Sequence, residues 1–123
     1  MCEMIDIVTA DHQPIYRDGI KRLLESQPDF RVVGEAGDAA TTIDQVRRHQ
    51  PAVLVLDLDM PSDAALDVLK RLAAMAEEVR TVVLTSSQEK ERLVTALQLG
   101  VRGVVLKGSP SALLIKGIRK VTE

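Results

Sequence analysis

The stretch VLVLDLDMP, residues 53–61, begins with four consecutive aliphatic residues and ends in acidic ones. A short, unbroken apolar run of this kind predicts a strand buried on both faces, which is typical of a parallel sheet. Asp57 and Asp59 stand at the end of this run, and Pro61 closes the stretch. The fold must therefore deliver carboxylates at the tip of a buried strand.

Short apolar runs alternate with amphipathic segments over the rest of the chain. The apolar runs predict strands at residues 4–10, 30–36, 52–57, 80–85 and 103–106. The segments with helical spacing predict helices at residues 14–27, 38–50, 65–75, 86–100 and 109–121. This alternation indicates an α/β domain with a parallel sheet and helices on both of its faces.

Five residues carry the signals for where the helices begin and end. Asp38 and Ser109 are predicted N-caps, Ser86 and Glu89 have the spacing of a capping box, and Gly100 is a C-terminal stop.

Composition excludes several classes of function. The 123 residues fit one domain, and a formal net charge of −2 gives no general attraction to nucleic acid or anionic membranes. With one Tyr, one Phe and no Trp, the chain lacks the aromatic platforms that stack on bases. No apolar run is long enough to span a bilayer, and the first residues lack the basic-then-apolar pattern that predicts a signal peptide. The single cysteine, Cys2, has no partner for an internal disulfide, so we expect a cytoplasmic protein.

Ligands of an open parallel sheet bind beyond the carboxyl ends of its strands. Apart from Glu35 near the end of the second strand, the polar residues at these ends are Asp11, His12, Asp57, Asp59, Thr85 and Lys107. Clustered carboxylates favour a bound cation, and Mg²⁺ is the hard ion that accepts oxygen ligands. A carboxylate is also able to accept a phosphoryl group, whose oxygens Thr85 and Lys107 would then contact.

Four motifs on these strands resemble the receiver domain of two-component response regulators. They are ADHQP (10–14), VLVLDLDMP (53–61), VVLTSS (82–87) and VVLKGSP (104–110). The stretch at 16–36, YRDGIKRLLESQPDFRVVGEA, is similar to the NarL/FixJ (LuxR-type) subgroup. The resemblance implies a flavodoxin-like (βα)5 three-layer sandwich with a parallel sheet in the strand order 2-1-3-4-5.

The resemblance also implies a role for each residue. Asp57 would accept a phosphoryl group from a sensor histidine kinase, and Asp11 would hold Mg²⁺. Asp59 would offer its backbone carbonyl to the metal, while its side chain tunes dephosphorylation. Thr85 would be the switch hydroxyl, and Lys107 would pair with the phosphate. Such a domain is a regulatory phosphoacceptor rather than an enzyme, because it catalyses only its own phosphorylation and slow dephosphorylation.

The family resemblance further implies partners and an output. Residues 1–123 would form a single receiver domain that forms a homodimer when phosphorylated. Relatives regulate transcription in bacteria through a C-terminal helix-turn-helix domain, and DNA would be bound only through such a domain. We expect either that this domain has been cut away from the chain or that the chain is a stand-alone receiver.

Four positions depart from the family pattern. His12 stands where relatives have a second metal-binding acid; this imidazole should weaken Mg²⁺ binding, and Mn²⁺ would tolerate its nitrogen better. Val104 replaces the aromatic residue that moves with the switch hydroxyl. Gly108 follows Lys107 where a cis-proline is common, and Ala65 replaces a glycine.

These departures leave two other functions open. A pseudo-receiver would be an interaction module independent of phosphorylation, as His12 and Val104 suggest. A phosphatase of the haloacid dehalogenase type would use the DLD sequence at 57–59. Those enzymes need a further acidic motif after the lysine, and the only acid after Lys107 is Glu123.

Overall fold

Five strands and five α-helices alternate along the computed structural model, which describes residues 3–75, 78–86 and 89–123. The strands are β1 (Ile5–Ala10), β2 (Phe30–Ala36), β3 (Val53–Asp57), β4 (Arg80–Thr85) and β5 (Gly103–Leu106). The helices are α1 (Pro14–Glu25), α2 (Ala39–His49), α3 (Ala64–Ala74), α4 (Lys90–Gln98) and α5 (Ala112–Thr122), and a short 3₁₀ helix, η1 (Pro61–Asp63), precedes α3. None of the helices in these ranges is long and apolar enough to cross a membrane. Cys2 lies outside the described residues.

The strands form one parallel sheet in the order β2-β1-β3-β4-β5, which confirms the predicted flavodoxin-like topology. The chain winds outward in one direction from β1 to β2 and in the other from β3 to β5. The strand order therefore reverses between β1 and β3, and ligands of such sheets bind at the carboxyl ends on either side of this reversal. Asp11 follows β1, and Asp57 ends β3.

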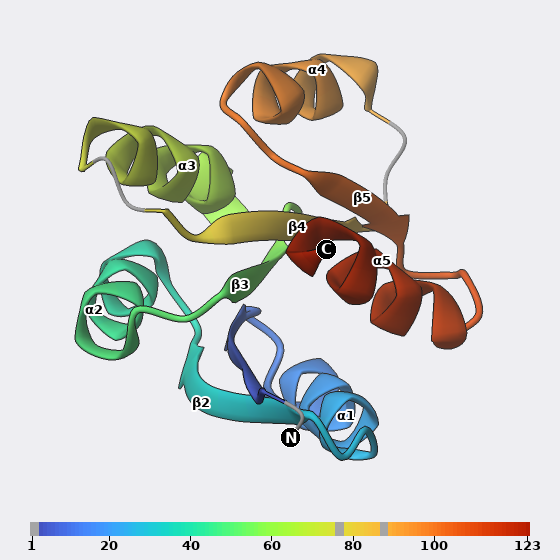
Figure 1. Ribbon diagram of the computed structural model, residues 1–123. Helices are drawn as coiled ribbons and strands as arrows, with labels where there is room; N and C mark the ends of the chain where they lie inside the picture. Colours follow the sequence, from blue (N-terminus) through green and yellow to red (C-terminus); the bar gives the residue numbers. More distant parts are fainter. Residues whose placement is uncertain (1–2, 76–77, 87–88) are drawn as a thin grey trace.

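Two hydrophobic layers hold the sheet between its helices. Figure 1 shows α2, α3 and α4 on one side of the sheet and α1 and α5 on the other. The predicted double burial of β3 is confirmed, because Leu54 and Leu56 pack into the first layer and Val53 and Val55 into the second. Each of these four side chains is at most 2% exposed. A strand packed from both sides is a rigid support for the residue at its tip.

Two of the predicted helix signals are confirmed by the backbone. The Asp38 side chain accepts a hydrogen bond from the Thr41 N–H at 2.7 Å, as an N-cap does. Gly100 follows α4 with a φ of +97°, and its N–H donates to the carbonyl of Leu97. The next N–H, from Val101, donates to the carbonyl of Ala96, which completes a Schellman motif.

The predicted starts of the last two helices are wrong by several residues. Helix α4 begins at Lys90 with Glu89 before it, and the Ser86 N–H, which a capping box would pair with the Glu89 side chain, donates to Asp59 instead. Helix α5 begins at Ala112, since the chain first makes a turn in which the Ser109 N–H donates to the carbonyl of Leu106. The helix therefore starts after Ser111 rather than after Ser109.

Replacing Gly100 by alanine should destabilise the protein, because a Cβ atom is disfavoured at its positive φ by about 1–2 kcal/mol. The matched control is Gly19→Ala in α1, where a Cβ would meet no atom within 4 Å. Alanine in a helix interior should stabilise by about 0.5–1 kcal/mol. Urea denaturation of both variants measures the difference, and equal effects of the two substitutions would contradict this account of the α4 terminus.

Candidate functional site

Asp11 and Asp57 lie on neighbouring strands at the reversal of the sheet. Ala10 at the end of β1 pairs with Leu56 of β3, so each carboxylate stands one residue beyond this pair. The Asp57 side chain is 0% exposed and that of Asp11 is 5% exposed. Burial of two carboxylates side by side is costly unless donors or cations compensate their charge.

Lys107 supplies one such cation from the end of β5. Its Nζ lies 3.1 Å from Oδ1 of Asp57 and 3.5 Å from Oδ2 of Asp11. The ammonium also sits 4.4 Å from the centre of the Tyr16 ring, which holds it by a cation–π contact. Burial alone would lower the pKa of Lys107, but the hydrogen bond to Asp57 and the nearby carboxylates outweigh it and raise that pKa. Lys107 therefore remains charged.

His12 makes the shortest contact with Asp57. Its Nδ1 lies 2.7 Å from Oδ2 of Asp57 and 3.9 Å from Oδ1 of Asp11. An ionised carboxylate only accepts hydrogen bonds, so the Nδ1–H of His12 is the donor to Asp57. The imidazole thus faces the acidic pair at the position where the family resemblance leads us to expect a second acid.

Asp59 links the acidic pair to the end of β4. Its N–H donates to Oδ1 of Asp57 at 2.9 Å, while its own carboxylate accepts from the Thr85 hydroxyl at 2.8 Å. The Ser86 N–H and hydroxyl donate to the same carboxylate at 2.6 and 2.8 Å. Partial burial raises the pKa of Asp59, but these donors, with Ser86 first, outweigh it and lower the pKa below its usual value.

Asp11 is the acid best prepared for a cation. Its Oδ1 accepts from the Gln13 N–H at 2.8 Å, but its buried Oδ2 has no hydrogen-bond partner among the described residues. Burial is the main reason that the pKa of Asp11 is raised, and repulsion from Asp57 adds to it. Ligand atoms of Asp11, His12 and Asp57 all lie within 4.8 Å of one another. This donor set, with an Asp11 Oδ2 that lies 3.5 Å from the Lys107 ammonium but accepts no hydrogen bond from the described residues, fits a divalent cation.

The structure therefore brings four of the six predicted side chains together and places the other two beside them. His12 and Lys107 each lie within 4 Å of both Asp11 and Asp57, and Thr85 faces Asp59. Glu35, the penultimate residue of β2, forms ion pairs with Arg17 and Lys21 instead.

Sequence reasoning missed three supporting residues. Tyr16 lies against Lys107, Arg17 donates to the carbonyl of Asp11 at 2.8 Å, and Ser86 binds Asp59. Tyr16 and Arg17 follow Asp11 closely in the sequence, but no helical or strand spacing indicates that their polar ends turn back to the strand tips. Ser86 has the spacing of a capping box, and that signal pointed to a different role.

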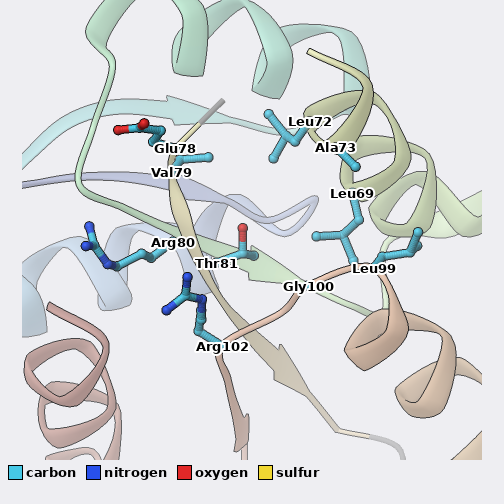
Figure 2. Close-up of a pocket in the computed structure, with 10 residues that line it drawn as sticks. All are labelled: Leu69, Leu72, Ala73, Glu78, Val79, Arg80, Thr81, Leu99, Gly100 and Arg102. Carbon is cyan, nitrogen blue, oxygen red and sulfur yellow. The ribbon is translucent and has the colours of Figure 1, made fainter. Parts of the chain in front are cut away.

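A cavity lies at the opposite end of the sheet, near the amino-terminal ends of β4 and β5. It has a volume of about 460 Å³ and is lined by Leu69, Leu72, Ala73, Glu78, Val79, Arg80, Thr81, Leu99, Gly100 and Arg102 (Figure 2). Among these lining residues Glu78 is the only acid, so the cavity lacks the paired carboxylates of the opposite end. The chemistry of the clustered acids is found at the carboxyl ends of the strands.

Residues 7–119 match the family model of the response regulator receiver domain. The chain belongs to the receiver domain family. Receiver domains are regulatory modules rather than conventional enzymes, and they bind Mg²⁺ at an acidic pocket. Among the described residues, Asp11, His12 and Asp57 form a group that could hold such an ion.

Among bacterial relatives, this receiver domain is similar to response regulators of the NarL and NreC type. It is 34% identical over 118 residues to the oxygen regulatory protein NreC of Staphylococcus epidermidis, covering 95% of this chain and 54% of that protein. It is also 34% identical, over 118 residues, to the nitrate/nitrite response regulator NarL of Escherichia coli, covering 96% of this chain and 55% of that protein. The receiver domain thus spans about half the length of these relatives.

Solved structures give the same result for the fold. The receiver domain superimposes on a LuxR-family two-component response regulator from Aurantimonas with a TM-score of 0.90 and 28% identity, covering 97% of this chain and 85% of the other. It superimposes on a signal receiver domain from Mycobacterium tuberculosis with a TM-score of 0.89 and 29% identity, covering 96% of this chain and 95% of the other.

Replacing Asp59 by asparagine should destabilise the metal-free protein by about 1 kcal/mol at neutral pH, because the Ser86 and Thr85 donors lose a charged acceptor. Because folding lowers the pKa of Asp59, its charge stabilises the protein at pH values above the ordinary aspartate pKa. That contribution is lost as the pH falls through the lowered value. Urea denaturation in a chelator, repeated at falling pH, should show the gap between wild type and variant closing.

The control for this measurement is Asp67→Asn, which removes an exposed ion pair with Arg71 on α3. Exposed pairs of this kind contribute little, so this variant should match wild type at every pH. A gap for Asp59→Asn that widens on acidification would refute the assigned contacts.

Proposed function

We propose that this receiver domain accepts a phosphoryl group on Asp57 from the phosphohistidine of a sensor histidine kinase. The observation that carries the proposal is the fully buried Asp57 carboxylate held between Lys107 at 3.1 Å and the neighbouring Asp11. In the transfer, a carboxylate oxygen of Asp57 forms a bond to phosphorus. The N–P bond of the donor breaks, and its electron pair returns to the donor imidazole.

The residues around Asp57 have complementary tasks in this transfer. Lys107 already lies at the acceptor, where its ammonium would pair with a phosphoryl oxygen. Asp11, Asp57 and the backbone carbonyl of Asp59 would hold a divalent cation, which would offset the negative charge of the carboxylates and the phosphoryl oxygens. Mg²⁺ would bind weakly because His12 replaces an acid, and Mn²⁺ would be the better tolerated ion.

The switch would consist in a change of partner for Thr85. Its hydroxyl donates to Asp59, and the same carboxylate holds Ser86 just before α4. A phosphoryl group on Asp57 would compete with Asp59 for the Thr85 hydroxyl and so bias the segment that leads into α4. Val104 on β5 is 38% exposed and offers no aromatic ring to report this change.

The output would be a change in dimerisation that regulates transcription in a cytoplasmic two-component system. Residues 1–123 would act as a single receiver domain. DNA binding would reside in an output domain, since NarL and NreC are about twice as long as this chain.

Incubation with acetyl phosphate and Mg²⁺ should add one phosphoryl group to the wild-type protein and none to Asp57→Asn, as measured by intact-protein mass spectrometry. The matched control is Asp63→Asn, an exposed acid of η1 that pairs with Arg92 and should still be labelled. If wild type gains no phosphoryl group with either Mg²⁺ or Mn²⁺, the proposal fails and an interaction module independent of phosphorylation becomes the better reading.

Replacing His12 by aspartate should tighten Mg²⁺ binding and speed phosphorylation, because the substitution puts an oxygen ligand beside Asp11 and Asp57 where the wild type has an imidazole. Isothermal titration calorimetry gives the affinity, and the mass assay followed over time gives the rate. Unchanged or weaker metal binding would show that the side chain at position 12 does not face the cation site.

A further inference from the structure

The acceptor carboxylate of Asp57 is almost fully occupied by donors. Its Oδ1 takes the Asp59 N–H at 2.9 Å and the Lys107 ammonium at 3.1 Å, and its Oδ2 takes the His12 imidazole at 2.7 Å. An ionised carboxylate offers about four acceptor positions, so a single one remains, on Oδ2.

Phosphorylation as proposed above needs more than that one position. A divalent cation would take one lone pair of Asp57, and the bond to phosphorus would take another. Before phosphorylation Lys107 still occupies Oδ1, so the cation must share Oδ2 with His12, whose Nδ1–H points at that oxygen and cannot itself ligate a cation.

His12 is the donor most able to leave. The Asp59 N–H is fixed in the backbone directly after β3. The Lys107 ammonium is enclosed by Asp57, Asp11 and the Tyr16 ring, with its side chain 11% exposed. By contrast, the His12 side chain is 32% exposed and lies on the connection between β1 and α1. It also borders an open hollow whose lining is completed by Gln13, Pro14, Ile15 and Tyr16.

We propose that His12 is an intramolecular competitor of the divalent cation for Asp57. In the metal-free protein its Nδ1–H holds Oδ2 of Asp57 and compensates part of the buried charge. When the cation binds, the imidazole leaves Asp57 and turns toward the open hollow. The biological role of this competition rests on the proposed function, but its test measures metal binding directly.

The competitor and ligand roles of His12 predict opposite results for its removal. If His12 were a ligand, His12→Ala would weaken metal binding, and Mn²⁺ more than Mg²⁺ because nitrogen suits Mn²⁺ better. If His12 competes with the cation, the same variant should bind both ions more tightly. A hydrogen bond to a charged group corresponds to a change of about tenfold or more in affinity.

Calorimetric titration of the full chain with MgCl₂ and MnCl₂ decides between these roles. We expect His12→Ala to bind both ions about tenfold or more tightly than wild type. His49→Ala, which removes the other histidine of the chain from the end of α2, should bind them as wild type does. Unchanged or weaker binding by His12→Ala would overturn the proposal.

Nuclear magnetic resonance of the imidazole nitrogens follows the movement itself, and with two histidines the assignment is simple. Addition of Mg²⁺ should shift the His12 Nδ1 signal away from its hydrogen-bonded value in step with calorimetric saturation, while His49 stays unchanged. A His12 signal that keeps this value in the Mg²⁺-saturated protein would contradict the proposal.

Acetyl phosphate labelling separates this inference from the proposed function. Tighter metal binding by His12→Ala without labelling of Asp57 in either protein would leave the competition intact and refute the phosphoacceptor role. If Asp57 is labelled but His12→Ala binds the metal no more tightly than wild type, the phosphoacceptor role would stand and the competition would be refuted.

Discussion

The carboxylate of Asp57, fully buried at the tip of β3, is the constraint on which the rest of the site depends. A charge in that position is costly unless donors surround it, and the fold provides three from three places. Lys107 comes from the end of β5, His12 from the connection after β1, and the N–H of Asp59 from the next turn of the chain. The double-sided packing of β3 fixes the position to which they converge.

A chain of hydrogen bonds connects this buried charge to the surface near α4. The Asp59 N–H contacts Asp57, and the Asp59 carboxylate holds both the Thr85 hydroxyl and Ser86. Asp59 therefore touches the acceptor with its backbone and the segment before α4 with its side chain. The pKa of Asp59 is lowered because its carboxylate accepts hydrogen bonds from Ser86 and Thr85. A change in charge at Asp57 is thus linked to the connection between β4 and α4 through two hydrogen bonds, one from the Asp59 N–H to Asp57 and one from Ser86 to Asp59.

Most of the fold could be predicted from local patterns, because apolar runs, helical spacing and caps act within a few residues. The Asp38 cap and the Gly100 terminus are of this kind and are confirmed. Ser86 and Ser109 are predicted to cap the last two helices, but the chain makes a tertiary contact at one and a turn at the other before each helix begins. Asp59 takes the Ser86 donors, and a turn on Leu106 takes the Ser109 N–H.

The sequence by itself determined which residues end each strand, and therefore that Asp11, Asp57, Thr85 and Lys107 gather at the carboxyl ends of the strands of a parallel sheet. Only the tertiary structure decided which donor meets which acceptor there. The contact of His12 with Asp57 and that of Thr85 with Asp59 join residues far apart in the chain. Both depend on the adjacency of β1, β3 and β4 and on side-chain rotation at the strand tips, which spacing along the sequence does not encode.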